Sequence, residues 1–162
     1  MSKSFLIAFG IGIVVIAIAV GGIFFVQRGD KIDLPGKILK VRTAALDDDS
    51  SVAVIDFRVA NPSNILFQVR EVTVEMDDNA GKSYLGQITS DTDAARLMEY
   101  MPVLGQKFNQ TLMMKERISA HSSLDRMVAA RFQCPLTMME ARKRFIVRVE
   151  EVDGKIFEYS EK

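Results

Sequence analysis

The stretch IDFRVANPSNILFQVREVTV, residues 55–74, decides the fold of this chain. Apolar and polar side chains alternate in its first part, and a period of two is typical of a half-buried β-strand. The apolar members are Ile55, Phe57 and Val59. We therefore expect these three side chains to face a hydrophobic core, with Asp56 and Arg58 on a face exposed to water.

The alternation stops at residues 61–63, Asn-Pro-Ser, and then resumes in a different phase. Pro62 fixes its own φ and keeps the preceding residue extended, while the Asn and Ser side chains can bond nearby backbone groups. The tripeptide therefore predicts a rigid corner that ends one strand and directs the next.

The strand expected after the corner, residues 65–76, changes parity halfway along. One parity holds Ile65, Phe67 and Val69, and the other holds Val72, Val74 and Met76. One face can stay apolar only if an extra residue is inserted near Arg70 and Glu71. The pattern predicts a β-bulge there, or a strand that changes sheets.

Short alternating runs separated by turn residues continue to the C-terminus and indicate an all-β sandwich, immunoglobulin-like or fibronectin-III-like, with one or two short helices. Ser90 with Asp93 predicts a helix start, Pro102 ends that helix, and Pro135 predicts the start of a shorter one. The expected strands are 38–46, 52–60, 65–76, 83–88, 112–118, 124–132, 144–151 and 155–159.

The last two strands are expected to form a hairpin. Pairing Val149 with Phe157 sets apolar side chains opposite each other, and the same register places Arg148 opposite Glu158. A three-residue loop remains, with Gly154 at the left-handed position that such loops require.

The N-terminal segment indicates a membrane anchor. From Phe5 through Phe25 to Val26, 22 residues contain no charge, amide or proline. A helix of this length is about 33 Å long, which exceeds a hydrocarbon core of about 30 Å. The alternative is a cleaved signal peptide that ends at residues 17–19, Ala-Ile-Ala. The expected organisation is a tail at 1–4, a transmembrane helix at 5–26, a linker at 27–36 and the sandwich at 37–162.

Two signals conflict on the orientation of this anchor. Basic residues between Arg28 and Arg42 outnumber those before the span, where Lys3 stands alone, and this bias favours a cytoplasmic domain. A short basic tail followed at once by a long apolar run is, however, also typical of an exported signal-anchor. The flanks alone leave the orientation open.

Composition and motifs exclude several classes of function. Lys plus Arg and Asp plus Glu both total 21, so the chain lacks the basic surface that nucleic acid requires. With one cysteine, Cys134, and one histidine, it forms neither an internal disulfide nor a Cys/His metal site. The acidic turns at 47–49 and 77–79 lack the ligand pattern of a calcium loop. We expect no metal and no cofactor, and a buried Cys134.

An enzyme is not expected either. His121 precedes Ser122 and Ser123, which raises the alternative of a hydrolase that uses His121 as a base. Neighbours on an extended segment point to opposite faces, and catalytic triads are defined by geometry rather than by adjacency. A histidine in a turn is the simpler interpretation.

The strand and corner motifs together resemble the LEA type 2 domain, the β-sandwich of late embryogenesis abundant proteins. The similarity covers about residues 38–159. The segments that resemble it are VAVIDFRVANPSN (52–64), ILFQVREVTVEM (65–76), ERISAHSSLDRMVAARF (116–132) and RFIVRVEEVDGKIFEY (144–159). The resemblance implies a non-enzymatic domain linked to stress response or to binding other macromolecules. Membrane-tethered plant relatives place the domain outside the cytoplasmic membrane, which favours the extracytoplasmic side here.

The segment 99–111, EYMPVLGQKFNQT, is the candidate partner site because it is long, aperiodic and rich in apolar side chains. The candidate contacts are Tyr100, Met101, Val103, Leu104 and Phe108. The sequence thus predicts a single-pass protein of the inner membrane that presents an interaction or protective module to a protein partner, as an accessory subunit of a membrane complex. The alternative is a carrier of lipid or another small apolar ligand between the sheets.

Overall fold

The structure is a computed structural model that describes residues 3–26 and 33–161. The chain divides into two compact units, one at residues 1–31 and one at residues 32–162. The first unit contains the helix α1 (Lys3–Val26), which starts two residues before the predicted span. Side chains of α1 are described at positions 9–10 and 12–22, so the predicted span residues Phe5, Phe25 and Val26 have side chains outside the described set. Among the described residues, no helix is long and apolar enough to cross a membrane.

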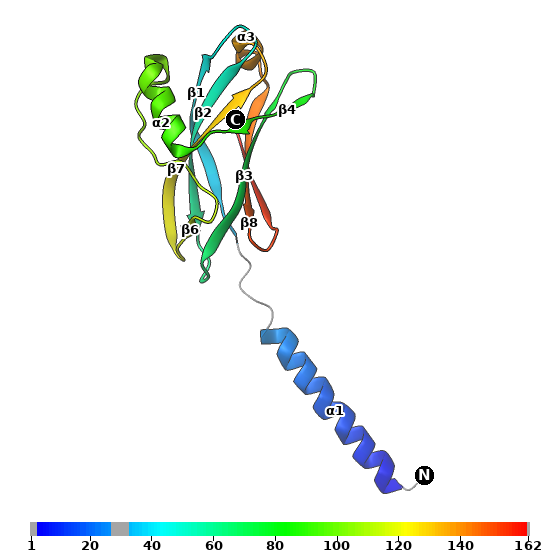
Figure 1. The fold of residues 1–162 in the computed structure, drawn as a ribbon. Helices are drawn as coiled ribbons and strands as arrows, with labels where there is room; N and C mark the ends of the chain where they lie inside the picture. The colour runs from blue at the N-terminus through cyan, green and yellow to red at the C-terminus, as the bar shows by residue number, and fades with distance from the viewer. Residues whose placement is uncertain (1–2, 27–32, 162) are drawn as a thin grey trace. The chain divides into compact units, whose positions relative to one another are not determined.

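The second unit is a β-sandwich, as the sequence predicts (Figure 1). One sheet has the order β1-β2-β7-β5 and the other the order β4-β3-β8-β9, with β6 paired to β3. The first sheet consists of β1 (Gly36–Ala45), β2 (Ser51–Asn61), β7 (Ser122–Phe132) and β5 (Gln87–Ile88). The second consists of β4 (Ser83–Leu85), β3 (Phe67–Asp77), β8 (Arg144–Glu151), β9 (Ile156–Ser160) and β6 (Arg117–Ile118).

Aromatic and branched side chains fill the space between the two sheets. The Phe57 and Tyr159 rings stack with centroids 6.0 Å apart, and the Tyr159 hydroxyl donates to the Leu34 carbonyl at 2.8 Å. Leu34 is itself fully buried in this core. The chain is therefore fixed to the sandwich from Leu34 onward, within the segment that the sequence assigns to the linker.

The inward face of β2 is as the sequence predicts, but its outward face is not. Ile55, Phe57 and Val59 are buried in the core between the sheets, and Arg58 is exposed. Asp56, which was expected to face water, is buried as well. The expectation of one wet face is wrong over most of β2, because a helix and a loop from elsewhere in the chain cover that face.

The β-bulge predicted in β3 is confirmed. The pairing of β3 with β8 shifts between Val69 and Glu71, so Arg70 is the extra residue. Phe67 and Val69 before the bulge and Val72 after it all face the core. Ile65 does not share this face, because it is exposed in the turn before β3.

The C-terminal hairpin has the predicted register. Val149 pairs with Phe157 and Arg148 with Glu158. Gly154 has φ +86°, which a β-branched residue strongly disfavours.

Two predicted strands are wrong in extent. The strand expected at 83–88 is split at Gly86, because β4 pairs with β3 in one sheet and β5 pairs with β7 in the other. A Cβ at Gly86 would lie 2.6 Å from the Phe132 ring, so this crossing needs glycine. The strand expected at 112–118 is reduced to β6, since the chain turns at Lys115 with φ +66°.

Both predicted helices are confirmed. Helix α2 (Asp91–Tyr100) begins at the N-cap Ser90, whose hydroxyl accepts from the Asp93 backbone N–H at 3.1 Å. A short 3-10 helix, η1 (Pro102–Leu104), follows at once. Helix α3 (Leu136–Glu140) starts after Pro135.

The Asn-Pro-Ser corner is fixed by the Asn61 side chain, which is fully buried. Its amide nitrogen donates to the Ile65 carbonyl at 2.8 Å and to the Ile118 carbonyl at 3.1 Å, while its oxygen accepts from the Ser63 hydroxyl at 2.6 Å. One side chain thus joins the end of β2 to the start of β3 and to β6.

Candidate interaction surface

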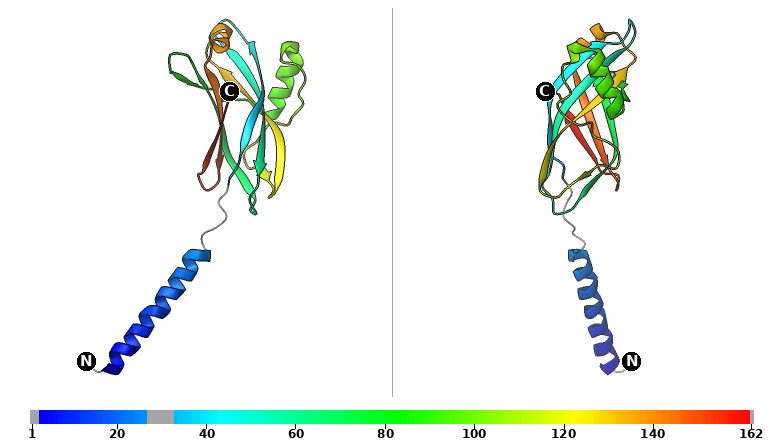
Figure 2. Two further views of the ribbon diagram at one scale, coloured as in Figure 1. Left: turned by 180° about the vertical axis from the view of Figure 1, so that it is seen from behind. Right: turned by 60° about the vertical axis from the view of Figure 1, so that its left-hand side comes forward.

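Helix α2 and the loop after it lie against the outer face of the first sheet (Figure 2). Alanine and valine side chains together with methionine and leucine side chains form this contact. The buried members of this second cluster are Ala44, Val52, Val54, Ala94, Met98, Leu104, Met127 and Ala129. The segment 99–111 is therefore mounted on a rigid base rather than on solvent-exposed turns.

A buried ion pair ties the loop to this face. The Arg42 guanidinium contacts the Asp56 carboxylate at 2.6 Å, and both side chains are more than nine-tenths buried. Arg42 also donates to the carbonyls of Leu104 at 2.6 Å and Gln106 at 2.9 Å, and Asn109 donates to Asp56 at 2.9 Å. Arg42 and Asp56 pair with each other from two neighbouring strands, and the loop supplies further hydrogen bonds to both buried charges, so the loop adds to the stability of the pair.

A second tie connects the loop to the first turn of α2. The Asp91 carboxylate accepts from the Lys107 ammonium and from the Thr111 backbone N–H, the latter at 2.9 Å. These hydrogen bonds, that from Lys107 foremost, lower the pKa of Asp91 to about 2. The carboxylate is therefore ionised at neutral pH and joins the middle of the loop, at Lys107, and its end, at Thr111, to the helix.

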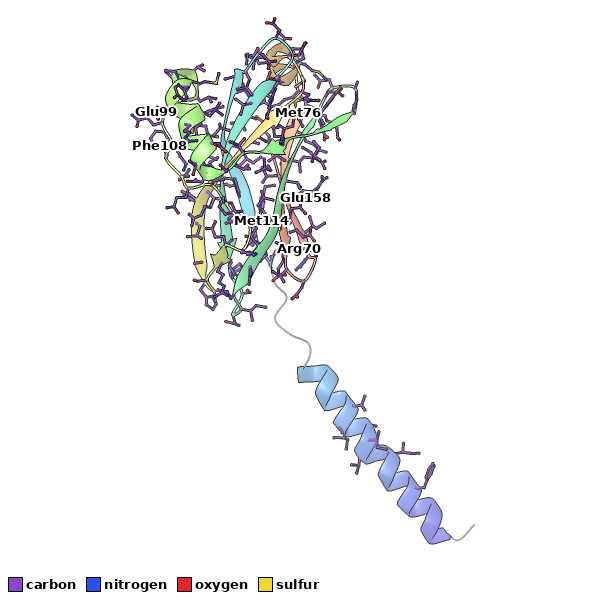
Figure 3. The ribbon with its side chains drawn as sticks, viewed as in Figure 1. Arg70, Met76, Glu99, Phe108, Met114 and Glu158 are labelled. Carbon is purple, nitrogen blue, oxygen red and sulfur yellow. The ribbon has the colours of Figure 1, made fainter. Side chains whose placement is uncertain are left out.

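Three of the five candidate contact residues lie at the surface. Tyr100 is 82% exposed, Val103 75% and Phe108 72%, and all three come from α2, η1 and the loop. A hollow of about 410 Å³ lies between α2 and the loop, bordered by Glu99, Pro102 and Gln106 among others. Figure 3 shows the labelled Glu99 and Phe108 on this side of the sandwich.

The other two candidate contact residues, Met101 and Leu104, are less exposed. Leu104 is fully buried in the second cluster, and Met101 is partly buried against it. The sequence assignment of Leu104 as a contact residue is corrected, because its side chain packs on the sheet and holds η1 there. The surface set reduces to Tyr100, Val103 and Phe108.

Another apolar groove opens at the edge between β3 and β5. Its volume is about 390 Å³, and Leu112 forms its floor, since that side chain belongs to the core. The lining residues are Glu71, Val72, Ile88, Thr89, Ser90, Leu112, Met113 and Met114. Met113 and Met114 are exposed at its rim.

The remaining sequence candidates have local structural partners. His121 occupies a turn with φ +54°, and its Nε2 lies 2.9 Å from the Asn64 side-chain oxygen. Ser122 donates instead to the Ser119 carbonyl at 2.6 Å. The hydrolase alternative gains no supporting contact from this arrangement and stays a prediction.

The acidic turns and the cysteine also have local explanations. Asp47 accepts from the Asp49 backbone and from the Ser50 hydroxyl, and Asp78 accepts from the Ala80 backbone. Cys134 is buried as expected, and this burial raises the pKa of its thiol. Among the described residues, no group of three or more His, Cys, Asp or Glu side chains could hold a metal ion.

Comparisons with known proteins add little to this geometry. No family model and no curated protein matches the chain. One solved structure that resembles it is an uncharacterized β-sandwich protein from Clostridium difficile 630, with 15% identity, a TM-score of 0.36 and coverage of 82% of each chain. Another is the structural genomics target SoR45, with 9% identity, a TM-score of 0.36 and coverage of 83% of each chain. Neither likeness is close enough to bear on function.

Sequence reasoning missed the side chains that fix the loop. Arg42, Asp56 and Asn109 stand at polar positions of alternating or irregular segments, where solvent exposure is the usual outcome. The separation of 53 residues between Asp56 and Asn109 leaves no local signal for their contact.

Proposed function

We propose that this chain is a single-pass membrane protein whose sandwich binds a protein partner through Tyr100, Val103 and Phe108. The exposure of these three large apolar side chains on a firmly held loop is the observation that supports this proposal. Aromatic side chains on rigid elements are frequent hot spots of protein interfaces. Such a module fits the role of an accessory subunit of a larger membrane complex.

The way the loop is held strengthens the case for binding. A partner that contacts this surface orders little additional chain, because Arg42 and Asp91 already bind the loop at several positions between residues 104 and 111. Preformed surfaces lose less conformational entropy on association than flexible ones. The resemblance to LEA type 2 domains, with their non-enzymatic roles in stress protection and binding, points to the same class of function.

The anchor is part of the same proposal and is supported by the sequence of residues 5–26. Its 22 uncharged residues are long enough to cross a bilayer. We place the protein in the inner membrane with the sandwich on the extracytoplasmic side. The full chain should stay in the membrane pellet through carbonate washing, and protease added to spheroplasts should cut between Gln27 and Asp33. A protected domain would overturn the outward orientation.

The contact surface is tested by substitution in the full chain. The variant with Tyr100→Ser, Val103→Ser and Phe108→Ser should lose a defined partner that co-purifies with the wild-type protein from detergent-solubilised native membranes. The control is Leu85→Ser, which removes a similarly exposed apolar side chain from β4 in the other sheet. Retention of the same partner by the triple variant, at wild-type yield, would refute this surface.

A ligand carrier is the second candidate, and the groove beside Met113 and Met114 favours it. Methionine side chains adapt to apolar ligands of varied shape. The groove opens at the edge of the sandwich, whereas Phe57, Phe132 and Phe145 fill the space between the sheets. Mass spectrometry of the purified protein should detect bound lipid that is lost in Met114→Glu if the groove is a carrier site. Equal lipid content in both proteins would exclude it.

A further inference from the structure

Four exposed apolar side chains gather at one end of the sandwich. The strand registers define this end, because Gly36 pairs with Val59, Asn61 with Ser122 and Glu150 with Ile156. The turns that meet there are residues 62–66, 119–121 and 152–155, opposite to α3 (Figure 2). The apolar side chains are Ile65, Leu66, Val152 and Ile156, with exposures of 40%, 48%, 50% and 55%.

The chain also enters the sandwich at this end. Leu34 is fully buried, and the Pro35 carbonyl accepts from the Ala60 backbone N–H at 2.9 Å. From Val26 to Asp33 there are seven residue steps, which extend to at most about 25 Å. If residues 5–26 span a membrane, the chain length alone keeps the end with the four apolar side chains near the lipid surface.

We infer that this end of the sandwich docks on the phospholipid surface, with Leu66 and Val152 inserted among the headgroups and Ile65 and Ile156 beside them. This inference rests on the proposed anchor. The tether raises the local concentration of lipid at this end, so even a weak apolar contact is occupied. Basic and acidic side chains are both present around the turns, among them Lys155 and Asp153. Apolar insertion rather than net charge therefore drives the docking.

Docking would also set the orientation of the partner surface. The two attachments, the tether at Leu34 and the turns around Leu66 and Val152, would together limit rotation of the sandwich against the membrane. Tyr100, Val103 and Phe108 would then keep one orientation relative to the bilayer rather than sample all directions. A partner embedded in the same membrane is the kind that such an arrangement favours.

The test uses the full chain in vesicles made of equal parts of phosphatidylcholine and phosphatidylglycerol. The single native cysteine, Cys134, is buried, so a nitrobenzoxadiazole thiol probe can be directed to Leu66→Cys or to Val152→Cys. The matched control is Leu85→Cys, an exposed apolar position in β4 near the opposite end. Labelling of the wild-type protein under the same conditions measures how much probe attaches to Cys134.

Probes at Leu66→Cys and Val152→Cys should shift to the blue and be quenched by nitroxide lipids with a shallow label, as expected for insertion of about 5–10 Å. The probe at Leu85→Cys should keep the emission of a water-exposed dye. With Leu66→Asp and Val152→Asp together, a probe at Ile156→Cys should lose its quenching.

The outcomes separate this inference from the anchor itself. Protein that floats with the vesicles but shows equal, water-like emission at all three positions overturns the docking and leaves the anchor intact. Protein that does not float overturns the anchor, and the docking with it. Protein that floats and is quenched at the two turns but not at β4 supports both.

Discussion

The inner and outer faces of the first sheet are buried in different ways. The inner face packs against the second sheet through large side chains such as Phe57 and Phe132, which recur with the period of the strand. The outer face packs against α2 and its loop through a smaller apolar cluster and the Arg42–Asp56 ion pair. The inner contact follows from each strand's own pattern, whereas the outer one exists only because the chain from α2 to residue 111 returns to cover the sheet.

This difference means that the two faces should respond differently to mutation. An inner side chain contributes through apolar area and close packing, so its truncation leaves a cavity that the neighbouring side chains fill only in part. An outer polar side chain contributes only while its partner is in place, since a lone buried charge is strongly unfavourable.

The largest expected effect is on the inner face. Phe57→Ala in the fragment 33–162 should lower the free energy of unfolding by about 3–5 kcal/mol, because it leaves a cavity in a fully buried site. Arg58→Ala, one residue along and facing outward in an exposed pair with Asp125, should leave the free energy of unfolding almost unchanged. Urea denaturation followed by circular dichroism measures both values. Similar losses in the two variants would contradict the assignment of the faces.

Substitution of a charged side chain on the outer face should lower the stability by a smaller amount. A second substitution should restore part of that stability. Asp56→Ala should cost about 3 kcal/mol, because the Arg42 guanidinium is left buried without its counter-charge. Adding Arg42→Met should restore part of this stability, and a double-mutant cycle measures the coupling. Limited proteolysis should show faster cutting at residues 105–110 in the single variant. Additive losses would show that Arg42 and Asp56 are not coupled, and unchanged cutting at residues 105–110 would show that the ion pair does not hold the loop.

The corner between β2 and β3 is held by hydrogen bonds from the uncharged Asn61 side chain, and substitution there tests their contribution to stability. Asn61→Ala should cost about 2 kcal/mol, because the Ile65 and Ile118 carbonyls lose a buried donor. Ser63→Ala removes one hydroxyl and leaves both of those bonds, so its loss should be smaller, about 1 kcal/mol. Thermal unfolding of the two variants decides the order. A larger loss of stability in Ser63→Ala would show that the serine contributes more than Asn61 to holding the corner.

The smallest effect is a pH dependence at the helix. The pKa of Asp91 is lowered to about 2 in the folded protein, so its contribution to stability is complete above about pH 4 and is lost as pH falls toward 2. Because the Asp91 side chain is partly exposed, solvent screening limits this contribution to under about 1 kcal/mol. The difference in melting temperature between wild type and Asp91→Asn should therefore shrink between pH 4 and pH 2. A difference in melting temperature that stays constant with pH would show that the hydrogen bonds from Lys107 and Thr111 do not depend on the charge of Asp91.

Much of the sandwich was predictable because its signals are local. The phase of Phe57, the bulge at Arg70 and the loop at Gly154 each follow from side chains within a few positions of one another. The helix α2 was predictable for the same reason, since its cap and its stop at Pro102 lie at its own ends. Such features depend on residues that are close together in the chain.

The candidate surface was predictable only in part. Tyr100, Val103 and Phe108 stand out in the sequence as apolar residues in an aperiodic segment, and the structure places them at the surface. Leu104 has the same sequence character but is buried, because its side chain meets the sheet when η1 folds back. No sequence feature within residues 99–111 distinguishes Leu104, which packs on the sheet, from the residues whose side chains are exposed.

The sequence by itself determined most of the strands, the corner at 61–63, the hairpin register and the position of α2, because alternation, capping and turn chemistry act between neighbours. Only the tertiary structure decided that Gly86 carries the chain between sheets, that Asp56 is buried and that the turn at Val152 meets the start of β3 at Gln68. Those features depend on contacts between residues far apart in the chain. Which distant segments meet is set by how whole sheets and helices pack, and no short window of sequence contains that information.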